Sequence, residues 1–119
     1  MNVEAVKKFC RSLPGATERE SGEPANVLAY YVGAKLFAYF KTSDPEKWRF
    51  SFRVTPERFI ELTDQPGIKP ARYMHRFHWV TVVSVSSLEA DRLKELIRWS
   101  YQDAFSRLTK KSQKEISGL

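Results

Sequence analysis

The chain has 119 residues, of which 42% are hydrophobic and 13% aromatic, enough for one domain around a single core. Its formal net charge of +6 favours a polyanionic partner such as DNA or RNA, or an acidic protein. The sequence has no apolar run of membrane-spanning length and no secretory signal at its start, and Cys10 is its only cysteine. These features exclude an internal disulfide and predict a cytoplasmic protein that binds no membrane.

The first half of the chain predicts a helix followed by strands. Val3, Val6 and Phe9 recur at helical spacing after Asn2, a suitable N-cap. Residues 47–53 alternate aromatic with polar side chains, as a strand with one buried face does. The expected elements are a helix over 3–12, a loop over 13–24, strands over 26–32 and 35–41 joined by a turn at Gly33, a loop over 42–46 and a strand over 47–53.

The second half predicts two more helices around an extended segment. Thr55 and Pro56 form the typical start of a short helix, and Ser87 is a suitable cap for a long one. Apolar side chains from Leu93 to Leu108 make one continuous helical stripe. The expected elements are a helix from 56, a loop over 64–70, an extended segment over 72–84 with a turn or bulge, a helix from 88 to about 109 and a polar, flexible tail over 111–119.

This order, α-β-β-β-α-β-β-α, predicts a two-layer α+β domain over residues 1–110. Short connections between strands favour an antiparallel sheet, and the helices are expected to cover one of its faces. The sequence has no Gly-rich phosphate loop, which argues against a dinucleotide-binding fold.

The second face of this sheet is expected to carry both cations and rings. If Trp48, Phe50 and Phe52 face the helices, strand alternation places Arg49, Ser51 and Arg53 on the other side, together with Lys47. In the neighbouring strand, Leu36, Ala38 and Phe40 would face the core, whereas Lys35, Phe37, Tyr39 and Lys41 would share the outer face. Such a face is typical of a single-strand nucleic-acid platform, but equally of a solvated sheet face or one covered by another subunit.

The segment RYMHRFHWV, residues 72–80, offers a second basic cluster. Arg72, Arg76 and Lys69 lie close in sequence to Tyr73 and Phe77, which fits either a phosphate-contacting edge or a polar rim that pairs with an acidic loop. The two histidines of this segment do not share a face at their spacing in a strand and have no further ligand frame. We therefore expect no metal, no cofactor and no catalytic residues, and a protein that is not an enzyme.

Several segments together resemble the YjbR/MmcQ-like family of small bacterial proteins, also called the DUF419 group. They are LPGATE at 13–18, VGAKLFAYF at 32–40, PGIKPARYM at 66–74, the His78–Trp79 pair with the following VTV, and Ser100–Tyr101. The resemblance covers roughly residues 3–110. It implies an α+β fold of the secretion-chaperone-like kind, related to frataxin, and a DNA-binding role through a double-wing arrangement. It implies no catalytic residues.

The leading hypothesis is electrostatic binding of nucleic acid, DNA in the first place, by a monomer or weak homodimer. Two alternatives stay open: a protein-interaction or chaperone-like module, and a small-molecule binder with a pocket near Glu18, His78 and Tyr101. The candidate nucleic-acid-binding residues are Lys35, Tyr39, Lys41, Arg49, Arg53, Arg72, Tyr73 and Arg76.

Overall fold

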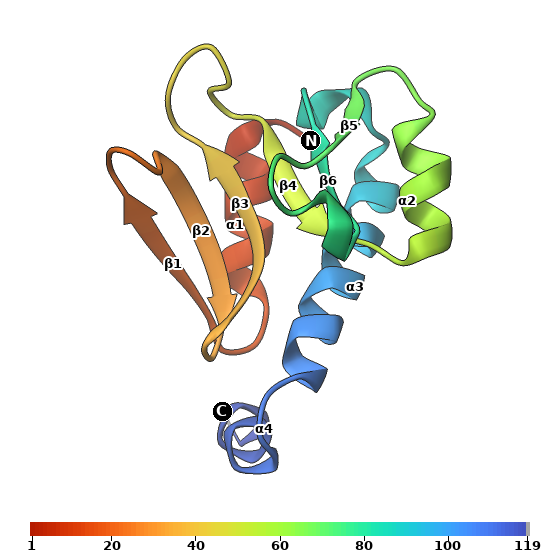
Figure 1. Ribbon diagram of the computed structural model, residues 1–119. Helices are drawn as coiled ribbons and strands as arrows, with labels where there is room; N and C mark the ends of the chain where they lie inside the picture. Colours follow the sequence, from red (N-terminus) through yellow and green to blue (C-terminus); the bar gives the residue numbers. More distant parts are fainter. Residues whose placement is uncertain (119) are drawn as a thin grey trace.

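The computed structural model describes residues 1–118, which form an open sheet and four α-helices (Figure 1). Two short 3-10 helices, η1 and η2, precede and follow the last strand. In chain order the elements are α1 (Val3–Ser12), β1 (Ala16–Ser21), β2 (Val27–Val32), β3 (Lys35–Lys41), β4 (Phe50–Arg53), α2 (Pro56–Thr63), β5 (Ile68–Pro70), η1 (His75–Phe77), β6 (Trp79–Val82), η2 (Val85–Ser87), α3 (Ala90–Ser106) and α4 (Lys110–Ser117).

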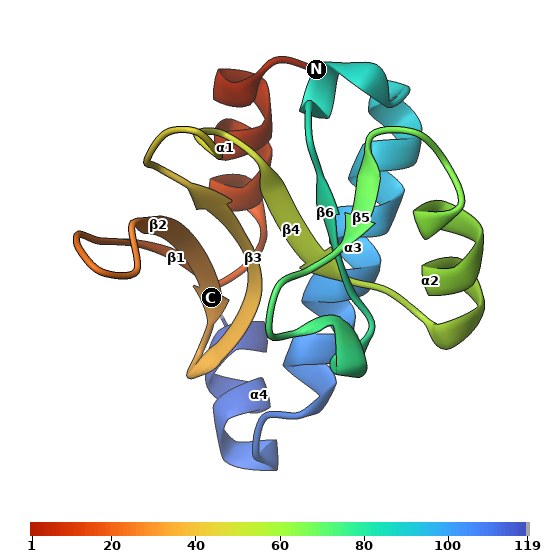
Figure 2. The same ribbon diagram turned by 45° about the horizontal axis from the view of Figure 1, so that its top comes forward.

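The sheet has six strands in the order β1-β2-β3-β4-β6-β5, and every neighbouring pair is antiparallel. Helices α1 and α3 lie across one face, and α2 packs beside β5 and β6 (Figures 1 and 2). In the described part of the chain no α-helix covers the central strands on the opposite face, which we call the outer face. The predicted α+β class with an antiparallel sheet is confirmed.

Capping side chains mark two of the helix starts as predicted. The Asn2 side chain accepts a hydrogen bond from the Ala5 amide, and the Thr55 hydroxyl accepts one from the Arg58 amide. The start of α3 differs from the prediction, because Ser87 belongs to η2 and donates its hydroxyl to the Ser84 carbonyl instead. Helix α3 begins at Ala90 without a side-chain cap.

Two edge strands lie where the sequence predicts loops. The side chains of β1 are mostly exposed, so the segment lacks the apolar alternation by which a strand is recognised. It is held by its antiparallel pairing with β2, from Ala16 opposite Val32 to Ser21 opposite Val27. Strand β5 has three residues and pairs with β6 in the same way. Both strands are therefore defined by backbone pairing rather than by a side-chain pattern.

Two strand predictions extend too far. The predicted strand over 47–53 begins at Phe50, because Trp48 has a φ of 68° in the left-handed region and ends the extended backbone there. Only Trp79–Val82 of the predicted segment 72–84 forms a strand. Tyr73 and His78, with φ of 67° and 64°, bend the chain on either side of η1.

A bulge in β3 changes the predicted faces of that strand. Tyr30 pairs with Ala38 and Tyr31 with Leu36, which leaves Phe37 as the extra residue. Phe37 is fully buried in the core, whereas Leu36 faces the outer side. The prediction that Leu36 faces the core and Phe37 the outer face is therefore wrong. Beyond the bulge, Ala38 and Phe40 lie in the core as predicted.

The Ser100 hydroxyl satisfies the backbone at this bulge. It donates to the Phe37 carbonyl at 2.6 Å and accepts a hydrogen bond from the Arg53 amide at 3.0 Å. One side chain of α3 thus joins β3 to the end of β4 in the interior, where an unpaired backbone group is costly. Within residues 1–118, no buried side-chain nitrogen or oxygen lacks a hydrogen-bond partner.

Residues 110–117 form helix α4 rather than the flexible tail expected over 111–119. The Thr109 hydroxyl caps the helix by accepting from the Ser112 amide. Ile116 packs against Gly15, where a Cβ atom would lie 2.8 Å from the isoleucine Cγ2. The sequence pattern did not reveal this helix because Ile116 is the one apolar residue of an otherwise polar segment, and the side chain of Gln113 ties the helix to the end of α3 by donating to the Phe105 and Leu108 carbonyls. Leu119 lies outside the described residues.

Cys10 lies on the buried face of α1 and is a fully buried core residue. Burial raises the pKa of its thiol to about 12, with a smaller contribution from the nearby carboxylate of Glu18. A thiol with so high a pKa carries very little thiolate at neutral pH, and the thiolate is the reactive form.

We predict that Ser100→Ala lowers the free energy of unfolding by about 1–3 kcal/mol, because it takes this partner from the buried Phe37 carbonyl and the partly buried Arg53 amide. Urea unfolding followed by circular dichroism measures the change. The matched control is Ser106→Ala, whose hydroxyl donates to the Asp103 carbonyl at an exposed position. Equal stability of the two variants would contradict the bridging role of Ser100.

We also predict that the folded protein reacts with a thiol reagent at pH 8 about a hundredfold or more slowly than the urea-unfolded chain. The reason is that unfolding restores Cys10 to water and lowers its thiol pKa toward the ordinary value of 9.0. Raising the pH from 9 toward 12 should speed the reaction of the folded protein. Equal rates for the folded and unfolded chain at pH 8 would show that Cys10 is accessible.

Candidate nucleic-acid interface

One cross-strand row of outer-face residues runs through all six strands. Successive pairings align the row in the order Arg19, Ala29, Tyr39, Ser51, Thr81 and Lys69. A cation therefore stands at each end, and small side chains occupy most of the middle. Ser51 and Thr81 share a hydrogen bond of 2.7 Å between their hydroxyls. Because these central side chains are short, the middle of the outer face is hollow.

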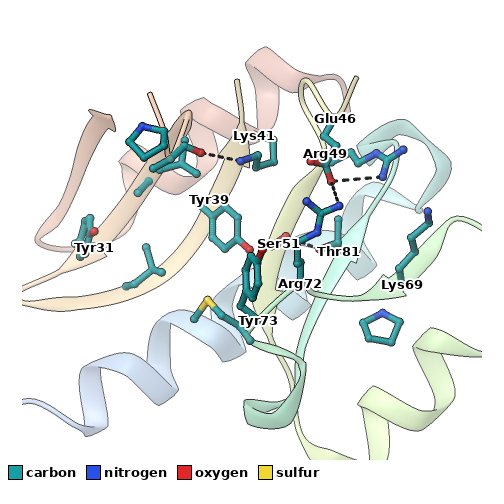
Figure 3. Close-up of a pocket in the computed structure, with 17 residues that line it drawn as sticks. Tyr31, Tyr39, Lys41, Glu46, Arg49, Ser51, Lys69, Arg72, Tyr73 and Thr81 are labelled. Carbon is teal, nitrogen blue, oxygen red and sulfur yellow. Dashed lines mark hydrogen bonds and ion pairs between the residues drawn. The ribbon is translucent and has the colours of Figure 1, made fainter. Parts of the chain in front are cut away.

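The hollow is a groove of about 600 Å³ (Figure 3). Small and apolar side chains of the sheet form its floor, and three loops raise its walls. Floor residues are Val27, Ala29, Tyr31, Leu36, Tyr39, Ser51 and Thr81, and wall residues are Pro24, Ala25, Lys41, Glu46, Arg49, Lys69, Pro70, Arg72, Tyr73 and Met74.

The charged residues of the groove are four cations and one carboxylate. Lys41, at the end of β3, donates to the Ala25 carbonyl at 2.7 Å and fixes one wall. Arg49 and Arg72 approach the Glu46 carboxylate at 3.9 and 3.6 Å. Lys69 completes the set on β5. The lining thus has an excess of positive charge, which attracts anions.

Aromatic rings lie beside these cations. Tyr39 packs on Trp79, with ring centroids 5.9 Å apart and planes tilted by 31°. Tyr73 is 82% exposed and stands at the edge of the groove next to Tyr39 (Figure 3). Tyr31 lies under the guanidinium of Arg19, 4.9 Å from its ring centroid. The groove therefore offers ring faces and positive charge side by side.

The structure brings together five of the eight residues predicted to bind nucleic acid. Tyr39, Lys41, Arg49, Arg72 and Tyr73 all line the groove.

The other three candidates lie elsewhere. Lys35 is exposed at the start of β3, and Arg76 is exposed on η1, where it packs on the ring of Phe77. Arg53 reaches α3 and pairs with Asp103 at 3.5 Å. Partial burial, together with the nearby Arg107, lowers the pKa of the Arg53 guanidinium.

Strand alternation could not have identified two groove features. Glu46 lies in a loop, and no spacing in the sequence relates it to Arg72. Leu36 reaches the floor only because of the bulge at Phe37. Lys69 was recognisable from its place in the basic cluster before residue 72, although the sequence does not show that it stands opposite Thr81.

The three residues considered for a small-molecule pocket have separate surroundings. The Glu18 carboxylate accepts a hydrogen bond from the Tyr30 hydroxyl at 2.7 Å and pairs with Arg11. Tyr101 donates to the Pro14 carbonyl and packs edge-on against Phe37. The ring of His78 packs against Phe59. The groove on the outer face includes none of the three.

Residues 1–118 contain neither a candidate metal site nor a candidate membrane-spanning helix. No group of three or more histidine, cysteine, aspartate or glutamate side chains is placed to hold a metal ion. No helix in the same range is both long and apolar enough to cross a membrane.

The fold and sequence are similar to those of known bacterial proteins. The chain is 27% identical to the uncharacterised protein YjbR of Escherichia coli over the full length of both. A crystal structure of the Deinococcus radiodurans protein DR2400, described by its DUF419 domain, matches with a TM-score of 0.80 and 30% identity, covering 98% of this chain and 88% of that one. A Pseudomonas syringae protein shares the fold, with a TM-score of 0.69 and 22% identity over 87% of this chain and 99% of its own.

The family model named YjbR matches residues 11–103, which include every strand of the sheet and most of α3. The match agrees with the resemblance found in the sequence. This protein belongs to the YjbR family.

Proposed function

We propose that this protein binds single-stranded nucleic acid, DNA in the first place, in the groove of the outer face and without catalysis. The observation that carries the proposal is the joint lining of one groove of about 600 Å³ by four cations and three tyrosines. Arginine and lysine side chains attract the phosphates whatever the sequence, and exposed rings offer stacking surfaces to the bases.

The tyrosine rings of the groove favour a single strand over a duplex as the ligand. Its tyrosines can stack only on bases that are unpaired, because the bases of a duplex stack on one another. Tyr39 lies on the floor, so a base that contacts it must enter the hollow, whereas the exposed ring of Tyr73 is available at the edge. A strand with free bases can place one there, while its backbone follows Arg49, Arg72 and Lys69.

A protein-interaction module is the second candidate. Tyr73 and Phe77 are 82% and 46% exposed, and such rings are common in protein interfaces. Phe37 no longer supports this alternative, because it is buried in the core. Light scattering would detect self-association, and binding that does not weaken with salt would favour a protein partner over nucleic acid.

We predict that Arg49→Gln/Arg72→Gln weakens binding of oligo(dT) and reduces the salt dependence of the affinity. Removing two phosphate contacts should lower the slope of log K against log salt concentration by about 1.4. Fluorescence anisotropy of a labelled strand across a salt series measures both effects. The same measurement with a labelled duplex compares the affinity for double-stranded DNA with that for single-stranded DNA.

The matched control for this pair is Lys110→Gln/Lys111→Gln, which removes the same charge from exposed positions on α4. The control should keep the wild-type slope. Equal losses in the two double variants would locate binding outside the groove. No binding by folded wild-type protein at low salt would overturn the proposed function.

A further prediction concerns Tyr73. Tyr73→Ala should weaken oligo(dT) binding by about 1–3 kcal/mol, the usual contribution of one base stacked on a ring. Tyr73→Phe keeps the ring and should bind as the wild type does. The side chain is largely exposed, so neither change removes core packing. If both variants bind as tightly as the wild type, Tyr73 is not a stacking residue.

A further inference from the structure

The carboxylate of Glu46 stands between two arginines at one end of the groove. The same oxygen, Oε2, lies 3.9 Å from Arg49 and 3.6 Å from Arg72 (Figure 3). Glu46 comes from the loop between β3 and β4, Arg49 from the residue before β4, and Arg72 from the segment after β5. Two parts of the chain that are far apart in sequence therefore place their guanidinium groups around one anion.

Both distances are longer than a hydrogen bond, which joins nitrogen and oxygen at about 2.7–3.2 Å. The guanidinium groups therefore keep donors that are not directed into a close contact with Glu46. The side chain of Arg72 is also 69% exposed, so it is accessible from solvent. The side chains of Glu46 and Arg49 are 27% and 26% exposed, so the pair is open to solvent on the Arg72 side. At these distances the ion pairs contribute little stability, and an acceptor that makes closer contacts with both guanidinium groups can replace the carboxylate.

A phosphate is such an acceptor. It offers several oxygens with full or partial negative charge, and arginine can bind two of them with parallel donors. The hydroxyls of Ser51 and Thr81 lie on the floor, and the rings of Tyr39 and Tyr73 lie beside them (Figure 3). The space next to the anion thus has ring surfaces where the base of a nucleotide can lie.

We infer that Glu46 occupies an anion subsite formed by Arg49 and Arg72, and that the phosphate of a nucleotide replaces its carboxylate when the groove is filled. The inference rests on the proposed function for the class of ligand. It adds that the subsite takes one nucleotide phosphate, from a nucleic-acid strand or a free nucleotide, and that Glu46 limits its affinity. No covalent step is involved.

The test compares Glu46→Gln with wild-type protein. Glutamine keeps the size of the side chain and removes its charge, so the phosphate no longer competes with a carboxylate or is repelled by it. We expect the affinity for dTMP and for unphosphorylated oligo(dT) to rise about three- to tenfold. Thymidine has no phosphate, so its affinity should stay unchanged. NMR titration measures the two small ligands, and anisotropy measures the strand.

Two controls separate this effect from a change in net charge or in folding. Glu115→Gln removes the same charge from an exposed position on α4 and should change each affinity less than about twofold. Glu46→Ala should produce the same direction of change as Glu46→Gln. Circular dichroism melting shows whether each variant is folded.

The outcomes distinguish this inference from the proposed function. If wild-type protein binds oligo(dT) and Glu46→Gln binds it no more tightly than Glu115→Gln does, the role of Glu46 is overturned and strand binding stands. If Glu46→Gln raises the affinity for dTMP but neither the wild-type protein nor any variant binds oligo(dT), the subsite stands and the proposed function fails. If Glu46→Gln raises the affinity for thymidine as much as the affinity for dTMP, the subsite does not recognise phosphate and the inference is overturned. Absence of binding to all three ligands overturns both.

Discussion

The Ser100 hydroxyl joins the helical layer to the two central strands at the bulge that sets the faces of β3. Its hydrogen bonds to the Phe37 carbonyl and the Arg53 amide satisfy the backbone at the bulge of β3 and at the end of β4. The bulge brings Phe37 into the core beside Tyr101 and turns Leu36 outward. Without this extra residue, one side of β3 would present a different set of side chains to the groove.

The groove is a consequence of side-chain size in one row of the sheet. Ala29, Ser51 and Thr81 are too short to fill the space above the strands, whereas the loops on either side carry long side chains. Tyr39 is the one large residue in the middle of the row, and it is held by packing on Trp79. A hollow with a largely apolar floor and a charged rim therefore forms over the sheet, and the bulge of β3 adds Leu36 to that floor.

The charges around this groove suit a ligand with both phosphate and rings. Cations on opposite walls come from β3, β5 and two loops, so no single segment could bind such a ligand alone. Glu46 partly neutralises them in the free protein and keeps the two guanidinium groups together. This arrangement supports the proposal of nucleic-acid binding and underlies the proposed role of the Glu46 carboxylate in limiting the affinity.

The sequence by itself determined the α+β class, the limits of α1 and α2, the antiparallel pairing of the central strands and the presence of a basic, aromatic outer face. It could do so because helix caps, strand alternation and the hairpin at Gly33 are local signals. Local signals also identified five residues that line the groove: Tyr39, Lys41, Arg49, Arg72 and Tyr73.

Only the tertiary structure decided the remainder. Strand β1 depends on pairing with β2, helix α4 depends on the contact of Ile116 with Gly15, and Arg53 turns to Asp103 instead of the groove. Glu46 meets Arg72 because two loops converge above the sheet. Each of these results depends on contacts between residues distant in sequence, and spacing along the chain carries no information about such contacts.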